Sequence, residues 1–315
     1  MPDNFLTINK EKIGLGEHKV INFDIASLPT RTSISLPVHV YRSQHKGPVL
    51  LLTGGLHGDE LNGVEIIRRM IESGDLIPDF GTVIAIPIVN IYGFIQNSRG
   101  LPDGKDINRS FPGIKKGGSL AKLLAYTLMK NIIPHIDYGI DFHTGGASRS
   151  NFPQIRVDLT NEKALEIAKA FQPPIIVNSK PIPKSFRSAS FKKGKNILVY
   201  ETGESSRFDE YGIQEAIKGT LRLMKFLGMK ESKLEAQETT IYSRSTWIRS
   251  GYAGLFSPSV KLGDRIKKKQ LLGHINGAYG ELHSRVLAPK EGRVIGLNYC
   301  PVVNKGDAII HYSYN

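Results

Sequence analysis

The sequence predicts an α/β fold with a layered, helix-covered sheet, followed by a small all-β module. Two observations support this prediction: strand-length apolar runs alternate with amphipathic segments over residues 48–232, and after residue 240 only short strands broken by glycine and proline follow. Alternating strands and helices are typical of a sheet covered by helices, whereas short, regularly spaced strands indicate a separate β structure. We therefore expect one domain over residues 1–235 and a β-barrel-like module over residues 236–315.

The pattern of apolar residues gives each expected element in order. The stretches HKVINFDIASL and TSISLPVHVYRS alternate as in half-buried strands and predict an antiparallel hairpin. In the segment DELNGVEIIRRMIES, Val64, Ile67 and Ile71 recur at helical spacing. The same criteria predict buried strands over 48–55, 82–90, 138–145 and 197–204, and helices over 62–73, 119–136, 161–171 and 209–229. The polar segment ESKLEAQETT is the expected linker to the C-terminal module.

Composition limits the class of protein. No apolar run reaches the roughly 20 residues of a membrane span, and the stretch MPDNFLTINKEKIGLGEHK lacks the apolar core of a signal peptide. The single cysteine, Cys300, excludes an internal disulfide and a Cys-rich zinc site and fits a reducing compartment. The net charge of +13 is spread over scattered lysines and arginines without a nucleic-acid-binding motif. We expect a cytoplasmic protein that binds neither nucleic acid nor membrane.

Four ionisable residues fall where predicted strands end. His57 and Glu60 follow the strand PVLLLTGG, His143 lies in DFHTGG and Glu201 lies in VYETGE. Any one of them alone is more often a structural loop residue. Because the carboxyl ends of parallel strands meet at one edge of a sheet, we expect all four to lie close together. Two histidines and one carboxylate form a known catalytic zinc set, and a further glutamate is then needed as a proton acceptor.

A long segment without periodicity, NIYGFIQNSRGLPDGKDINRSFPG, lies between the second predicted strand and the next helix. Long aperiodic loops inside a compact domain are usually functional or disordered. This one contains Arg99, Asn108 and Arg109. Arginine binds carboxylates in a fork geometry, and a second arginine can stabilise a developing oxyanion.

The ordered motifs GGLHGDE, DINR, DFHTG and YETGE resemble the succinylglutamate desuccinylase/aspartoacylase family of the zinc carboxypeptidase clan, over about residues 45–235. The resemblance implies a zinc-carboxypeptidase-like, three-layer α/β/α catalytic domain with a mixed sheet. The longer strings GGLHGDELNGVEI, VNIYGFIQNSR and RSNFPQIR look closest to a bacterial subgroup. Some members of that subgroup are associated with enzymes that glutamylate ribosomal protein S6.

The resemblance also implies roles for the residues at the strand ends. His57, Glu60 and His143 would hold one Zn²⁺ per chain. Glu201 aligns with the general base that activates the attacking water, and Arg99 aligns with the arginine that polarises the scissile carbonyl.

The candidate substrate-binding residues come partly from the resemblance and partly from their position in the sequence. Asn108 and Arg109 align with the pair that grips the substrate's carboxylate. The family's further specificity residues have no clear match in this chain. Arg156 is a candidate because of its strand position just after His143, and Arg187 and Tyr279 are weaker candidates.

The C-terminal module resembles the hybrid barrel of biotinyl and lipoyl carriers, and its half-motif VKLGDRI recurs loosely as VNKGDAI. A carrier needs an exposed lysine in the central hairpin, and the corresponding stretch NGAYGELHSRV has none. We therefore expect a packed module that borders the catalytic cleft and narrows it.

These observations together predict a zinc-dependent hydrolase that cleaves the amide bond of an N-acyl amino acid or a similar carboxylate-bearing substrate. One alternative keeps the metal site and replaces the substrate by an acidic, glutamate-rich peptide tail, which the basic charge favours slightly. A second alternative is a non-catalytic protein that binds acidic partners. The identity of the acyl group and homo-oligomerisation are left open.

Overall fold

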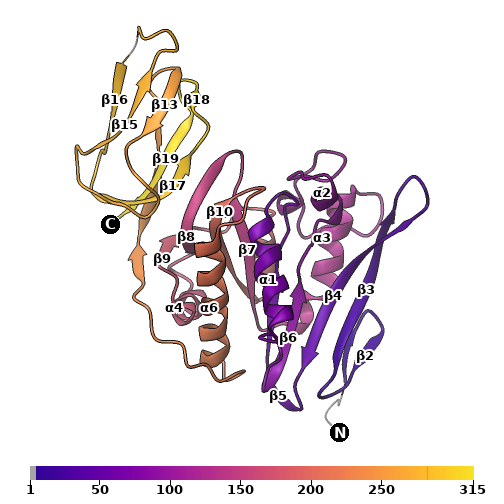
Figure 1. Cartoon of the computed structure of the whole chain (residues 1–315). Helices are drawn as coiled ribbons and strands as arrows, with labels where there is room; N and C mark the ends of the chain where they lie inside the picture. Colours follow the sequence, from indigo (N-terminus) through magenta and orange to yellow (C-terminus); the bar gives the residue numbers. More distant parts are fainter. Residues whose placement is uncertain (1–4, 282) are drawn as a thin grey trace.

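The architecture is centred on one large mixed sheet (Figure 1). The computed structural model describes residues 5–281 and 283–315, and within these ranges 13 strands belong to this sheet. Along its main path the order is β12 (Arg244–Arg249), β19 (Ala308–Tyr314), β17 (Gly292–Asn298), β8 (Arg149–Val157), β10 (Asn196–Glu204), β7 (Tyr138–Gly145), β5 (His45–Thr53), β6 (Phe80–Ile86), β4 (Ser33–Arg42) and β3 (His18–Ser27). Strands β10, β7, β5 and β6 are parallel, whereas β8 runs antiparallel to β10 and β17, and β4 runs antiparallel to β6 and β3. The predicted α/β class with a mixed sheet is confirmed.

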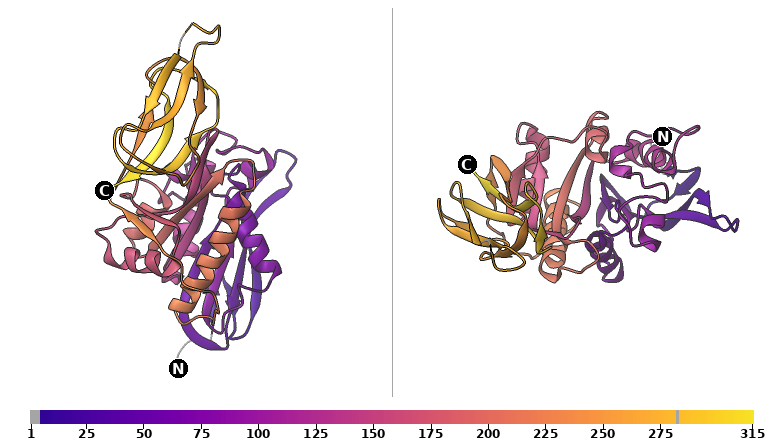
Figure 2. Two further views of the ribbon diagram at one scale, coloured as in Figure 1. Left: turned by 60° about the vertical axis from the view of Figure 1, so that its left-hand side comes forward. Right: turned by 90° about the horizontal axis from the view of Figure 1, so that it is seen from above.

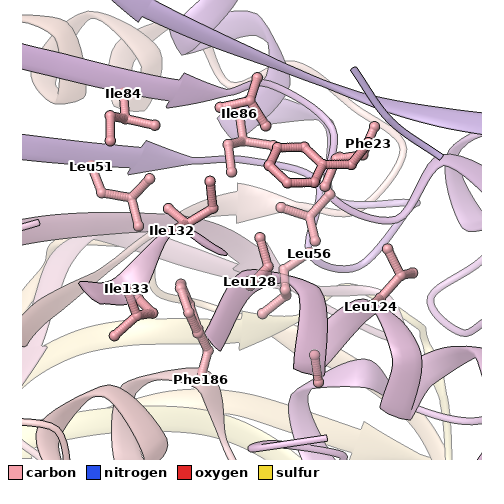
Figure 3. Close-up of a cluster of buried hydrophobic side chains, with 14 of the residues drawn as sticks. Phe23, Leu51, Leu56, Ile84, Ile86, Leu124, Leu128, Ile132, Ile133 and Phe186 are labelled. Atoms are coloured by element: carbon pink, nitrogen blue, oxygen red, sulfur yellow. The ribbon is translucent and has the colours of Figure 1, made fainter. Parts of the chain in front are cut away.

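Helices pack on both faces of the parallel strands. One face carries α1 (Leu61–Glu72), α4 (Glu162–Phe171) and α6 (Glu210–Phe226), and the other carries α3 (Leu120–Asn131) and α5 (Phe186–Phe191). The alternation of side chains along β5 explains both layers, since Leu50 and Leu52 pack against the first group of helices and Leu51 against the second (Figure 3). All three leucines are fully buried, so the domain has the three layers that the sequence predicted.

The predicted N-terminal hairpin forms as β3 and β4, with His18 opposite Tyr41 at one end and Ser27 opposite Ser33 at the other. Before it, β1 (Leu6–Ile8) and β2 (Glu11–Ile13) make a further small hairpin that the sequence did not predict. Each of its strands has only three residues, which is too short for a periodic signal.

Proline shortens two of the predicted elements. The strand expected over 82–90 ends at Ile86, directly before Pro87. The helix expected over 119–136 ends at Asn131, and a 3₁₀ turn, Ile133–His135, follows it with Pro134 in its first turn. Proline lacks the N–H that helix and sheet need, which accounts for both endings. The longest described helix, α6, has 17 residues, and none of the described helices is long and apolar enough to cross a membrane.

Three short elements were not predicted, because each spans six residues or fewer. They are α2 (Ile91–Ile95), β9 (Ile175–Asn178) and α5. Their positions matter for the site. Helix α2 lies in the long aperiodic loop, and α5 covers the sheet beside β10.

The C-terminal module has its own hydrophobic core, formed by buried residues between Phe256 and Tyr312. Its second sheet, as far as the structure describes it, has the order β16 (His283–Leu287), β15 (Leu271–Asn276), β13 (Gly254–Pro258) and β18 (Val302–Val303). Strands β12, β19 and β17 instead continue the main sheet, because β17 pairs with β8. Two further short strands also join this sheet: β11 (Thr240–Tyr242) pairs with β9, and β14 (Arg265–Ile266) pairs with β17. The module therefore sits at the β8 end of the sheet, opposite the N-terminal hairpin (Figure 2). The boundary at residue 235 remains a prediction, since ladder hydrogen bonds cross it.

The loose internal repeat corresponds to a repeated turn. Asp264 accepts a hydrogen bond from the backbone N–H of Lys261 at 2.8 Å, and Asp307 accepts one from the backbone N–H of Asn304 at 2.7 Å. The two half-motifs thus fold alike, each as a turn that leads into a strand.

Candidate metal centre and active site

The four ionisable residues predicted at strand ends do meet at one edge of the sheet. Strands β5, β7 and β10 are parallel, and their pairing places Thr53 opposite Asp141 and His143 opposite Glu201. His57 and Glu60 lie in the loop that follows β5. Their convergence is therefore a direct consequence of the parallel register.

Glycines allow the loop after β5 to fold tightly over this edge. A Cβ on Gly54 would lie 2.6 Å from the backbone carbon of Gly63, and one on Gly58 would lie 1.9 Å from that of Gly93. Only glycine tolerates such close approaches between backbones. The glycines in LLTGGLHGDE thus bring His57 and Glu60 to the sheet edge, and α1 begins directly after Glu60.

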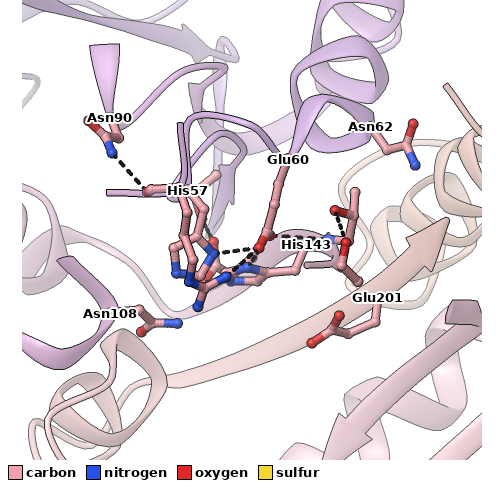
Figure 4. Close-up of polar contacts among 12 residues, drawn as sticks. His57, Glu60, Asn62, Asn90, Asn108, His143 and Glu201 are labelled. Atoms are coloured by element: carbon pink, nitrogen blue, oxygen red, sulfur yellow. Dashed lines mark hydrogen bonds and ion pairs between the residues drawn. The ribbon is translucent and has the colours of Figure 1, made fainter. Parts of the chain in front are cut away.

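His57, Glu60 and His143 form a buried cluster (Figure 4). Nδ1 of His57 lies 2.7 Å from Oε1 of Glu60, and Nδ1 of His143 lies 2.8 Å from Oε2. One potential ligand atom from each residue lies within 4.8 Å of the others. Nδ1 of His57 makes no hydrogen bond of acceptable geometry although it is buried. A buried nitrogen without such a partner, facing a carboxylate and a second imidazole, suits a bound cation.

Two aspartates that the sequence analysis did not single out hold the far sides of the histidine rings. Asp106 lies 3.1 Å from Nε2 of His57, and Asp141 lies 2.7 Å from Nε2 of His143. The hydroxyl of Thr53 donates to the second oxygen of Asp141 at 2.7 Å. Metal-binding histidines typically use their second nitrogen in this way, because the carboxylate fixes the ring and its tautomer.

The charges in the cluster shift the pKa values of its carboxyl and imidazole groups in opposite directions. Burial alone would raise the pKa of the Glu60 carboxyl, but the facing imidazoles of His57 and His143 bring it well below its usual value. Burial likewise opposes protonation of His143, yet Asp141 and Glu60 raise the pKa of its ring well above the ordinary value. Any cation bound here has to displace protons from the imidazoles, so its affinity should increase with pH.

Glu201 is held from β8, outside the cluster of potential ligand atoms. Its Oε2 accepts a hydrogen bond from the amide of Asn151 at 2.8 Å, and its Oε1 lies 3.4 Å from the guanidinium of Arg156. Asn151 was not predicted, because the antiparallel pairing of β8 with β10 cannot be inferred from either strand alone. Both oxygens of the carboxylate are thus oriented by neighbours on one strand.

Arg99 lies between Glu60 and Asp106. Its guanidinium is 2.9 Å from Oε1 of Glu60 and 3.1 Å from Oδ2 of Asp106. Asn90 fixes the backbone of this loop by donating to the carbonyl of Arg99 at 3.3 Å and to that of Gly100 at 3.2 Å. The aperiodic segment is therefore ordered around the cluster.

Asn108 and Arg109 follow in a single 3₁₀ turn (Ile107–Arg109). The side-chain oxygen of Asn108 accepts the backbone N–H of Phe186 at 2.9 Å, so its amide N–H groups remain available to a ligand. Arg109 donates to the carbonyl of Asn108 at 2.7 Å.

Arg187, a weaker candidate for a specificity residue, lines the same cleft as Arg156 and Glu201. It lies in α5 and donates to the carbonyls of Arg156 at 2.6 Å and Lys180 at 3.0 Å. Burial lowers the pKa of Arg187 to about 10, and the neighbouring charge of Arg156 contributes. The cleft thus concentrates positive charge beside Glu201.

A cleft of about 370 Å³ opens onto this arrangement. The structure brings nine candidates from the sequence together in its lining: His57, Glu60, Arg99, Asn108, Arg109, His143, Arg156, Arg187 and Glu201. Tyr279 does not belong to it, because it lies next to the tip of the β15–β16 hairpin with 96% of its surface exposed. Trp247, on β12 of the C-terminal module, does line the cleft.

Comparison with known proteins agrees with this geometry. Residues 46–227 match the model of the succinylglutamate desuccinylase/aspartoacylase catalytic domain. The N-alpha-acetyl-L-2,4-diaminobutyric acid deacetylase of Halomonas elongata is 28% identical over 295 residues, which cover 88% of this chain and 85% of the relative. A succinylglutamate desuccinylase/aspartoacylase from Rhodobacter sphaeroides superposes with a TM-score of 0.82 at 25% identity over 95% of both chains. The product-bound ectoine utilization protein EutE (DoeB) from Ruegeria pomeroyi gives a TM-score of 0.83 at 24% identity, again over 95% of both chains, and so shares the fold.

Proposed function

We infer the function of this chain from the fact that it belongs to the succinylglutamate desuccinylase/aspartoacylase family, whose catalytic-domain model it matches over residues 46–227. It is an amide hydrolase that removes the acyl group from an N-acyl amino acid or a similar carboxylate-bearing substrate. One observation above all supports this: the His57–Glu60–His143 cluster and the Glu201 carboxylate line the same arginine-rich cleft. The relative from Halomonas elongata is named as a deacetylase of an N-acetyl amino acid, which has the same type of scissile bond.

The cluster fits one Zn²⁺ per chain. Two imidazole nitrogens and one carboxylate are a donor set of catalytic zinc sites, and the buried Nδ1 of His57 has no hydrogen bond that would compete. A zinc ion held there supplies a Lewis acid that polarises a carbonyl and acidifies water. Asp106 and Asp141 hold Nε2 of the two rings, so that each Nδ1 faces the Glu60 carboxylate and would be available as a metal ligand.

The remaining residues divide the work of hydrolysis. The carboxylate of Glu201 accepts a proton from the attacking water and passes it to the leaving amine nitrogen, so that one water is consumed for each amide bond broken. Asn151 and Arg156 hold that carboxylate in place. Arg99 donates to the carbonyl oxygen as negative charge develops on it.

Arg109, together with the free amide N–H groups of Asn108, binds a carboxylate of the substrate. Arg109→Lys keeps the charge but loses the planar fork that binds both carboxylate oxygens, so we expect KM to rise about tenfold or more with a smaller change in kcat. Steady-state kinetics on the best N-acyl amino acid measures the effect. Zinc content should be unchanged. Equal wild-type activity on the substrate and on its carboxamide analogue would contradict the clamp.

The alternative substrate is an acidic peptide tail. The net charge of +13 and the arginines that line the cleft favour anionic ligands of either size. A non-catalytic protein for acidic partners would bind such ligands without turnover.

A substrate panel separates these hypotheses. The zinc-loaded protein is incubated with N-acetyl and N-succinyl amino acids and with glutamate-tailed peptides, and the released amines are quantified. We expect release from N-acyl amino acids. Release of glutamate from the peptides alone would establish the carboxypeptidase instead, and binding without release from any of them would exclude an enzyme of either kind.

A further inference from the structure

The carboxylate of Glu201 is held mainly by one buried neighbour. The amide of Asn151 donates to Oε2 of Glu201 at 2.8 Å, whereas Arg156 lies 3.4 Å from Oε1. Asn151 is 4% exposed, and the side chain of Arg156 is 29% exposed. A hydrogen bond is stronger where water is excluded. The position of the Asn151 amide therefore largely determines the position of the carboxylate.

Asn151 is itself packed against the C-terminal module. On β8 it lies between Gly203 of β10 and Gly296 of β17, its two partners in the sheet. A Cβ on Gly296 would lie 3.2 Å from Oδ1 of Asn151 and 3.1 Å from Cβ of His311. Optimal contacts between non-bonded carbon atoms are about 3.5–4.0 Å long. The missing side chain at position 296 thus leaves the space that the amide needs.

Of the two neighbours of Gly296, the amide is the one that can move. Cβ of His311 is fixed, because β19 is paired with β12 on one side and with β17 on the other. The ring of His311 is also buried and stacks on Trp247, with centroids 4.6 Å apart. Oδ1 and Nδ2 of Asn151 belong to one amide group, so a shift of the oxygen also moves the donor that holds Glu201.

A β-bulge in β17 produces this arrangement. The pairing of β17 with β19 shifts register between Val294 and Gly296, so Ile295 is the extra residue. The carbonyl of Ile295 accepts a hydrogen bond from Nε2 of Gln154 at 3.3 Å, and Gln154 lies directly opposite Glu201. Bulges are common next to active sites, where they change the direction of side chains. Successive residues of this bulge contact the two β8 residues that lie beside Glu201.

We propose that Gly296 is a positioning residue for the general base, because its lack of a side chain lets Asn151 hold the carboxylate of Glu201. The role of Glu201 as the base rests on the proposed function. Since β17 contributes to the hydrophobic core of the C-terminal module, this module takes part in catalysis as well as bordering the cleft. A larger residue at position 296 displaces the amide and leaves Glu201 with the longer contact to Arg156.

Gly296→Ala tests this role. Because a small misplacement of a reacting group lowers the rate steeply, we expect kcat to fall about tenfold, with KM changed less than about twofold. One zinc per chain should be retained. Steady-state kinetics on the best N-acyl amino acid and metal analysis measure these quantities. Gly251→Ala is the matched control and should leave kcat unchanged, since Gly251 is an exposed glycine of the same module whose added Cβ meets nothing within 4 Å.

A double-mutant cycle shows whether the effect passes through Asn151. Asn151→Ala should also lower kcat about tenfold, and adding Gly296→Ala should cause no further loss, because the amide that the methyl group displaces is gone. Losses that multiply, or a wild-type kcat in Gly296→Ala, would overturn the proposal.

The same pair of variants decides the matter if Gly296→Ala alone does not fold. Folding of the double variant would support the contact with Asn151. Failure of both to fold would assign the need for glycine to His311 and overturn the proposal.

Crystal structures of the wild type and of Gly296→Ala measure the contact without turnover. We expect Nδ2 of Asn151 to leave hydrogen-bond distance of Oε2 of Glu201, and an unchanged contact would overturn the proposal. Loss of the contact in a protein whose wild type hydrolyses nothing would retain the link from Gly296 to Glu201 and exclude the hydrolase. Wild-type hydrolysis, with contact and kcat unchanged in the variant, would retain the hydrolase and exclude the role of Gly296.

Discussion

Replacing Glu201 by glutamine should lower kcat by about 10²–10⁴-fold, the usual contribution of a positioned general base. Glutamine keeps the shape of the side chain and can still bond to Asn151, but it cannot accept the proton of the attacking water. Because Glu201 lies outside the group of potential ligand atoms, we expect the variant to retain one zinc per chain.

Turnover and metal content, measured on the same preparation, test this expectation. Glu204→Gln on the same strand is the matched control, since Glu204 pairs with Arg207 and is absent from the cleft lining. Loss of zinc from the Glu201 variant would make Glu201 a ligand. Near-normal turnover with zinc bound would assign the base to another residue.

The double substitution His57→Ala/His143→Ala should abolish both zinc binding and hydrolysis. It removes two of the three proposed ligands and leaves a single carboxylate, which is too little for a tightly bound zinc ion. His45→Ala, at an exposed histidine outside the cluster, should change neither quantity.

Because the double variant leaves Glu60, Asp106 and Asp141 without their imidazole partners, it can also lose stability. Asp141→Asn is the milder test: it keeps all three ligands and should lower zinc affinity by about 10–100-fold. Competition with a fluorescent zinc chelator measures that affinity. Unchanged zinc binding in both variants would show that the metal lies elsewhere.

The sequence could predict that His57, Glu60, His143 and Glu201 converge, because their positions follow from the order of the strands. Once β5, β7 and β10 are recognised as buried parallel strands, their carboxyl ends must share an edge. The loop residues Arg99, Asn108 and Arg109 were candidates because their loop is long and aperiodic, and the resemblance supplied their individual roles. The hydrogen bonds of Asn90 show how that loop is held at Arg99 and Gly100.

The supporting residues depend on contacts that no local pattern reveals. Asp141 is two positions from His143, but only the fold shows that Thr53 orients it toward the ring. Asn151 reaches Glu201 through the antiparallel pairing of β8 with β10. Trp247 reaches the cleft because β12, β19 and β17 extend the main sheet beside β8. This extension depends on the pairing of β17 with β8, in which Gly296 lies opposite Asn151, far away in the sequence.

Zinc titration of chelator-stripped wild-type protein tests the central claim most directly. The claim is that this chain hydrolyses an amide bond with a metal held by His57, Glu60 and His143. The rate of amine release from the best N-acyl amino acid is followed at each addition. We expect almost no release without metal and a linear rise that levels off near one zinc per chain. Full activity in the stripped protein, or one bound zinc per chain with no hydrolysis of any substrate in the panel, would contradict the claim.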